Sequence, residues 1–166
     1  MKYLHHLIDK VILFFIGRSF VILADKNKSL QKELSYLPDN FIAAVAVDEN
    51  GPYVVVGKEG KNIKYYGYHK DPGNTDLKIY FKDEEFAYQV LSAKEGIRQA
   101  FSEHKVIIEG DIKYAVSFIY ILEIVEAHLM SDEFAEQVLS YDFKREMSRI
   151  QLLIRSLLLF KEKGRI

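Results

Sequence analysis

The side chains best suited to catalysis or metal binding are spread along the chain rather than grouped. His5 and His6 are adjacent, so they point to different sides of a helix, whereas His69, His104 and His128 fall in separate predicted elements. None of them has the HxxxH or HExxH spacing that brings two imidazoles to one metal ion. The sequence therefore predicts no metal site and no cofactor.

Acidic and glycine-rich segments also have simpler explanations than catalysis. Asp83-Glu84-Glu85 offers neighbouring carboxylates for general acid–base work, but it stands at a predicted helix start, where acids complement the helix dipole. The segment Gly57-Lys-Glu-Gly-Lys lacks the GxxxxGK[ST] pattern of a phosphate-binding loop. No GxSxG motif is present, and the serines and histidines show no triad order. We therefore predict that the chain is not an enzyme.

Four tyrosines at positions 65, 66, 68 and 80 lie among lysines, a mixture that also occurs on sheets that bind single-stranded nucleic acid. Tyrosine is equally a common strand residue, and Asp71 and Asp76 reduce the local positive charge. The formal net charge of −1 gives no basic surface overall. We therefore expect no nucleic-acid partner.

The length and composition indicate one folded domain that spans residues 1–166. A chain of 166 residues is about the size of one domain, and its 49% hydrophobic and 28% charged content is typical of a globular protein. The chain has no cysteine, so neither disulfides nor thiolate chemistry are available. This composition fits a cytoplasmic protein.

Positive charge collects at the two ends of the chain. Residues 1–28 hold five basic and two acidic side chains, and residues 142–166 hold seven basic and three acidic ones. The middle is therefore acidic. Basic ends could contact an anionic membrane surface, or they could be the solvated faces of two helices.

The most apolar run, residues 11–24, does not predict a membrane span. A helix that crosses a bilayer needs about 20 apolar residues, whereas this run is shorter and has Arg18 in its middle. Asp9 and two histidines precede it, and Ile22-Leu23-Ala24 is a poor cleavage site for a signal peptide. We expect no secretory signal.

Hydrophobic periodicity and turn residues predict an alternation of strands and helices. Apolar or alternating runs predict strands over 41–47, 53–57, 63–68, 76–81 and 106–108, of which the first three form an antiparallel meander. Helical spacing predicts helices over 2–24, interrupted near Gly17, over 29–36, from Asp83, around 97–101, over 113–129, over 132–139, and from Tyr141 or Asp142 to about Lys161.

The stretch from Asp76 to Leu122 carries a resemblance to a known family. Its segments in order are TDLKI (75–79), DEEF (83–86), LSAK (91–94), QAF (99–101) and KVIIEGD (105–111), followed by Ala115. Their order and spacing resemble the sterol carrier protein type 2 domain, and the match extends plausibly back to Phe41. Ala93 and His104 stand where that family has glycine, and neither favours the backbone of a tight glycine turn.

The resemblance implies an α+β fold: a five-stranded mixed, mainly antiparallel sheet with helices on one face, plus extra N- and C-terminal helices. The sterol-carrier-like core would span 41–129, the N-terminal helices 1–37 and the C-terminal helices 131–163. It further implies an apolar cavity between sheet and helices. Ten apolar residues are expected to line it, namely Phe81, Phe86, Val90, Leu91, Ile97, Phe101, Ile108, Phe118, Ile119 and Leu122.

Such a domain would bind and carry a lipid, with an acyl, sterol or isoprenoid chain in the cavity and peripheral contact with a membrane. The alternative is a non-enzymatic interaction or accessory module with a filled core. That module would form a homodimer through its terminal helices or act as partner of a lipid- or quinone-modifying enzyme.

Overall fold

The centre of the molecule is a five-stranded mixed sheet. The computed structural model describes residues 2–139 and 143–159. The strands are β1 (Ile42–Ala46), β2 (Tyr53–Glu59), β3 (Asn62–His69), β4 (Leu77–Phe81) and β5 (Val106–Gly110), in the order β3-β2-β1-β4-β5. β1 is parallel to β4, and the other neighbouring pairs are antiparallel. The predicted sheet is confirmed.

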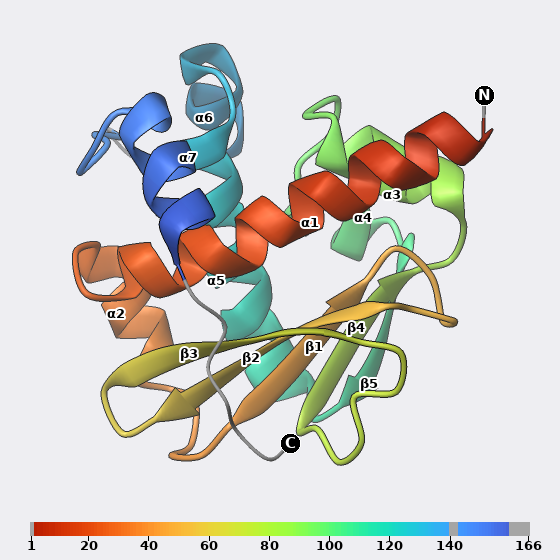
Figure 1. Ribbon diagram of the computed structural model, residues 1–166, viewed down its shortest axis with the longest axis horizontal. Helices are drawn as coiled ribbons and strands as arrows, with labels where there is room; N and C mark the ends of the chain where they lie inside the picture. The colour runs from red at the N-terminus through yellow and green to blue at the C-terminus, as the bar shows by residue number, and fades with distance from the viewer. Residues whose placement is uncertain (1, 140–142, 160–166) are drawn as a thin grey trace.

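Helices cover one face of this sheet (Figure 1). They are α1 (Lys2–Ala24), α2 (Lys28–Leu34), α3 (Glu84–Leu91), α4 (Ile97–Ser102), α5 (Ile112–Leu129), α6 (Asp132–Val138) and α7 (Arg149–Leu158). α1 runs across the helical layer and contacts α3, α5, α7 and β3. No helix in the part of the chain that the structure describes is both long and apolar enough to cross a membrane. The α+β class with added terminal helices is confirmed.

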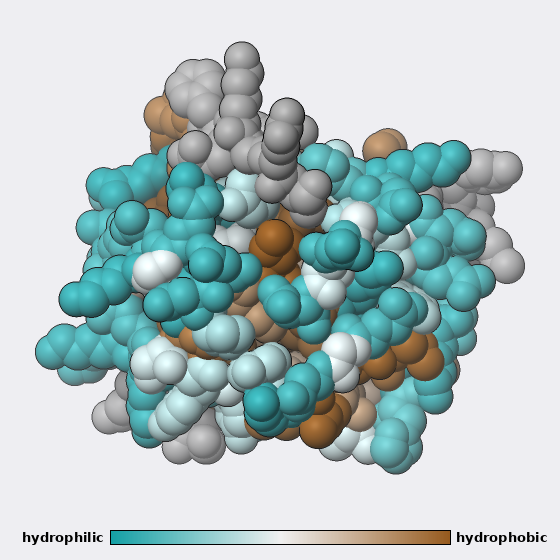
Figure 2. Space-filling view, turned by 90° about the horizontal axis from the view of Figure 1, so that it is seen from below, coloured by the Kyte–Doolittle hydropathy of each residue, from teal (hydrophilic) through white to brown (hydrophobic). Residues whose placement is uncertain are grey.

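The two faces of the sheet have different environments. Leu77, Ile79 and Phe81 of β4 are buried against the helices, while Lys78 and Tyr80 point to the other face. This is the alternation that the sequence predicted. The face away from the helices carries a small apolar cluster of Ala44, Ala46, Tyr53, Val55 and Tyr66. In Figure 2, which views the molecule from below, apolar side chains gather near the middle of the surface, and hydrophilic ones surround them.

Helix α1 lies directly on the sheet at Gly17. A Cβ atom at this position would stand 2.5 Å from Cγ1 of Val54 and 3.1 Å from Cε2 of Tyr65, so only glycine permits this approach. The predicted interruption near Gly17 is wrong, because α1 is continuous from Lys2 to Ala24. Here the glycine serves helix–sheet packing rather than a break in the helix.

The last helix is shorter than the sequence predicted. Residues 143–148 are not helical, and α7 begins only at Arg149. The hydroxyl of Ser148 accepts a hydrogen bond from the Gln151 amide at 3.2 Å, and the Gln151 side chain accepts one from the Ser148 amide at 3.2 Å. This capping box fixes the helix start. The predicted start at Tyr141 or Asp142 and the predicted end at Lys161 lie outside the described residues.

Two turns place a residue other than glycine in the left-handed backbone region that glycine usually occupies. Ala93 has a φ of 61° and His104 a φ of 58°. After α3, the Lys94 amide donates to the Gln89 carbonyl and the Ala93 amide to the Val90 carbonyl, both at 2.9 Å. The same two bonds follow α4, so each helix ends in a Schellman motif. The turns that the family makes with glycine are therefore present, with a strained backbone at both positions.

Replacing Ala93 by glycine is expected to stabilise the protein. An L-residue in the left-handed region is strained, and relief of this strain outweighs the added freedom of the unfolded chain, so Ala93→Gly should raise the free energy of unfolding by about 0.5–1 kcal/mol. Urea denaturation measures the change. Ala87→Gly, at a fully buried position in the interior of α3, is the control and should lower stability by about 1–2 kcal/mol, because it loses both helix propensity and a buried methyl group. Equal losses in both variants would contradict the prediction.

Candidate functional site

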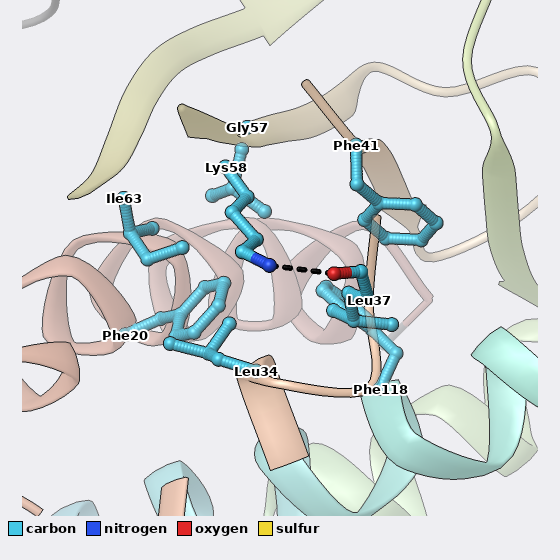
Figure 3. A pocket seen from close by; sticks show the side chains of 9 residues that line it. Phe20, Leu34, Leu37, Phe41, Gly57, Lys58, Ile63 and Phe118 are labelled. Carbon is cyan, nitrogen blue, oxygen red and sulfur yellow. Dashed lines mark hydrogen bonds between the residues drawn. The ribbon is translucent and has the colours of Figure 1, made fainter. Parts of the chain in front are cut away.

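A small pocket lies between the sheet and helices α1, α2 and α5 (Figure 3). Its walls are Phe20, Leu34, Leu37, Phe41, Val56, Gly57, Lys58, Ile63 and Phe118. The volume is about 10 Å³, which is space for about one water molecule. Pockets that hold drug-sized ligands usually have about 300–1,000 Å³. At this place the layer between sheet and helices is therefore nearly filled.

Aromatic rings from three parts of the chain pack at the base of the pocket. Phe20 comes from α1, Phe41 directly precedes β1, and Phe118 comes from α5. The Phe20 and Phe118 rings meet edge to face with centroids 5.9 Å apart, and the Phe41 and Phe118 centroids are 6.3 Å apart. Such contacts are held by packing alone, without hydrogen bonds that fix the partners. Moving these rings apart would break no hydrogen bond, but it would disrupt close packing in the core.

Lys58 provides the one charged group of the pocket wall. Its Nζ donates a hydrogen bond to the Leu37 carbonyl at 2.5 Å and lies 3.6 Å from Oδ1 of Asp39. The Lys58 side chain is only 12% exposed, whereas that of Asp39 is 75% exposed, so the ammonium group marks the solvent side of the pocket. Figure 3 shows the lysine stem beside Gly57 with its nitrogen directed at Leu37. A cation above an apolar hollow suits a ligand with an anionic head and an apolar tail.

The ten residues predicted to line a cavity belong mainly to the packed core beside this pocket. Phe118 alone among them also lines the pocket. Phe81, Val90, Leu91, Ile97, Ile119 and Leu122 are buried, and Phe86, Phe101 and Ile108 are partly buried against the same cluster. They do share the layer between sheet and helices, as expected. Their role as ligand contacts stays a prediction.

Sequence reasoning missed most of the pocket wall. Phe20, Leu34 and Leu37 come from the N-terminal helices and the segment after them, which the family resemblance does not cover. The predicted strand over 53–57 ends one residue before Lys58, which belongs to β2. For Phe20 the signal is the dense apolar content of residues 11–24, which indicates burial without giving the partner, and this run does not reach Leu34, Leu37 or Lys58.

Two buried carboxyl groups on α5 lie outside the pocket. Burial raises the pKa of Glu126 well above its usual value, and its Oε2 accepts a hydrogen bond from the Ile97 amide at 3.3 Å. Burial also raises the pKa of Glu123 to about 7, against the opposing effect of Arg98, whose Nε is 3.1 Å away. Glu126 caps the start of α4, where Gly96 offers no side-chain cap. These acids therefore have structural roles.

The acidic helix start at residue 83 has the structural role that the sequence indicated. Oδ1 of Asp83 accepts a hydrogen bond from the Phe86 amide at 2.9 Å and so caps α3. Asp111 caps α5 in the same way, through the Lys113 amide at 3.0 Å. Both acids cap the N-termini of helices, which supports a structural role for them rather than a role in acid–base chemistry.

His128 is a buried structural histidine. Its Nδ1 donates to the Ile124 carbonyl at 2.7 Å, and its Nε2 lies 2.5 Å from Oε2 of Glu146. The other oxygen of Glu146 accepts from the Asn27 side chain at 2.9 Å. Among the side chains that the structure describes, in residues 7–139 and 143–159, no three histidine or acidic groups come close enough to hold a metal ion. This pair instead fastens the segment before α7 to α5.

Comparison with known proteins gives similarity at the level of structure only. No family model matches the chain, and no curated protein matches it. A solved "UbiJ-SCP2 Ubiquinone synthesis protein" is 13% identical, has a TM-score of 0.45, and the match covers 72% of this chain and 96% of that one.

Two further solved structures are sterol carrier proteins. Sterol Carrier Protein 2 from Yarrowia lipolytica, in its apo form, is 16% identical with a TM-score of 0.38 and coverage of 66% and 85%. The sterol carrier protein domain 2 of Helicoverpa armigera is 17% identical with a TM-score of 0.37 and coverage of 66% and 84%. The first structure has SCP2 in its name, and the other two are named as sterol carrier proteins.

Proposed function

We propose that the chain is a non-enzymatic lipid-binding protein that holds an acyl, sterol or isoprenoid chain between the sheet and the helices. The observation that carries this proposal is the apolar pocket with three phenylalanine rings at its base and Lys58 at its solvent side. The pocket is located in the layer where the sequence resemblance predicts a lipid cavity. The absence of cysteine agrees with a cytoplasmic site of action.

Lipid uptake requires this layer to open. A tail buried there gains about 0.8 kcal/mol for each CH₂ group removed from water, but the present hollow has room for about one water molecule. The ligand must therefore separate Phe20, Phe41 and Phe118 and enter among the ten predicted core residues. Separating the rings breaks apolar packing contacts, whose loss the burial of the lipid tail must offset.

Native mass spectrometry of gently purified protein tests the proposal directly. We expect a bound lipid near one per chain, either retained from the cell or acquired from added fatty acid, acyl-CoA or sterol. Organic extraction then identifies the ligand class. A protein that stays at its apo mass with all three additives would overturn lipid binding in this layer.

The head group is expected to contact Lys58 if the ligand is acidic. Lys58→Gln should then weaken the binding of a fatty acid by roughly tenfold, because a charge-assisted contact in a half-buried site contributes about 1.5 kcal/mol. Lys61→Gln, which changes an exposed lysine in the β2–β3 turn, is the matched control and should bind as the parent does. Binding of a neutral sterol should be unaffected by both substitutions. Equal fatty-acid affinities for all three proteins would exclude the Lys58 contact.

The small volume of this pocket favours one alternative, in which the fold is an interaction or accessory module without a ligand. In that case the protein would dimerise through its terminal helices or serve a lipid- or quinone-modifying enzyme. Sedimentation velocity at micromolar concentration separates the two: a dimer with a clean apo mass supports the module, and a lipid-loaded monomer supports the carrier.

A further inference from the structure

Helix α7 turns its apolar side away from the protein. Ile150, Ile154, Leu157 and Leu158 are 52–70% exposed. Their spacing of four, three and one residues gathers them on one side of a helix. Leu152 and Ser156, on the opposite side, are buried. We call the four exposed residues the α7 stripe.

The contacts of the buried side fix this orientation. Arg18 Nη1 of α1 donates to the Ser156 carbonyl at 2.7 Å, and the hydroxyl oxygens of Ser19 and Ser156 are 3.0 Å apart. The Arg18 guanidinium also lies 4.1 Å from the centroid of the Phe14 ring. Rotating α7 to bury the stripe would break these bonds and leave polar groups of α1 unpaired. The stripe is thus an outward surface of the folded protein.

Positive charge borders the stripe. Arg149 and Arg155 stand on either side of it, both exposed, and α7 contains no acidic residue. The sequence continues with Lys161, Lys163 and Arg165 against a single acid, Glu162. This arrangement is complementary to an anionic membrane surface. The apolar side chains can insert among the acyl chains, and the basic side chains can contact the anionic headgroups.

We infer that the α7 stripe docks on the surface of a membrane that contains anionic lipid. A second copy of the chain fits less well, since two such faces would bring arginines together. One face of a ten-residue helix, which is only about 15 Å long, is also too small to bury the roughly 800 Å² on each partner that is typical of a stable dimer. A bilayer has no such area requirement, because each apolar side chain and each nearby cation adds to binding.

Vesicle flotation with the full chain tests this docking. We expect binding to vesicles of phosphatidylcholine with phosphatidylserine and much weaker binding to phosphatidylcholine alone. The double variant Ile154→Gln/Leu157→Gln should reduce binding to the anionic vesicles by about tenfold or more, and Arg155→Gln by about fivefold. Ile112→Gln removes an isoleucine that is 58% exposed on another helix, so it should bind like the parent.

Three results would overturn the inference. The first is that the parent protein does not bind anionic vesicles, and the second is that the double variant binds them as tightly as the parent. The third is that the parent is a dimer and the double variant is a monomer. The last result would assign the stripe to a second copy. Circular dichroism confirms that each variant is folded. The assay uses the outer surface of α7 alone, so its outcome does not depend on whether the pocket holds a lipid.

Discussion

Replacing Arg145 by alanine is expected to lower the free energy of unfolding by roughly 2–4 kcal/mol. Its Nη2 donates to the carbonyls of Ala127 at 2.9 Å and Met130 at 2.8 Å, and its guanidinium pairs with Asp132. These carbonyls stand at the C-terminal end of α5, where the helix leaves acceptors unpaired and a cation is favourable. Alanine would leave the Ala127 carbonyl without this donor, while the Met130 carbonyl would keep only the bond from Arg149 at 3.2 Å. The segment that leads into α7 would then be held less firmly.

Urea denaturation measures this loss, and limited proteolysis reports where it acts. We expect the earliest cleavage of Arg145→Ala between α6 and α7. Arg145→Lys should recover only part of the stability, because an ammonium group cannot span several carbonyls as the planar guanidinium does. Lys144→Ala removes the exposed neighbouring cation and serves as the control. Equal stability of the Arg145→Ala and Lys144→Ala proteins would show that the contacts contribute nothing.

The second large effect is expected at Asp9, whose carboxyl group is buried in α1. Neither of its oxygens has a hydrogen-bond partner among the described residues. Burial, with smaller contributions from Glu84 and Glu85 at the start of α3, raises the pKa of Asp9 to about 7. Ionised Asp9 therefore works against the packing of α1 on α3.

The direction of the pH dependence follows from the two pKa values. The folded protein keeps the Asp9 proton up to about pH 7, while the unfolded chain releases it near pH 4. The unfolded state therefore binds fewer protons between these values, and the free energy of unfolding falls as the pH rises through this window. Above about pH 7 the loss is complete. Glu123, with a pKa of about 7, contributes a slope of the same sign.

Asp9→Asn should remove the Asp9 part of this slope. We expect the stability difference between Asp9→Asn and the parent to grow by about 1–3 kcal/mol in favour of the variant from pH 5 to pH 8. Urea denaturation at the two pH values gives the difference, and any fixed cost of packing an amide cancels from it. Asp25→Asn, at an exposed position, should show no such growth. A constant difference for Asp9→Asn would contradict a raised pKa.

The strands could be predicted because their signals are local. Leu77, Ile79 and Phe81 alternate with polar neighbours, and Asn50-Gly51 marks the first turn of the meander, so the residues alone predict these pieces. The parallel pairing of β1 with β4 joins segments that are over 30 residues apart. The mixed pairing of the sheet was predicted only through the family resemblance, because no local pattern specifies which distant strand is a neighbour.

The helices and the site depended on contacts that sequence patterns do not contain. Gly17 looked like a helix interruption, because intrinsic preference disfavours glycine in helices, but close packing on Val54 outweighs that preference. Arg145 looked like one of several solvated cations, and its carbonyl partners could be identified only from the folded path of the chain. The pocket wall was missed for the same reason, because Phe20 and Phe118 lie almost 100 residues apart.

The bonds from Arg18 and Ser19 to Ser156 have a consequence for synthesis of the protein on the ribosome. They join residues separated by 138 and 137 positions, so they cannot form until Ser156 has been translated. At about 5–20 residues per second, α1 waits roughly 7 to 28 s for α7. During that interval the surface of α1 that α7 covers, around Arg18 and Ser19, remains open to chaperones and to other nascent chains. Slower translation of the last quarter of the message should therefore increase aggregation of the new protein.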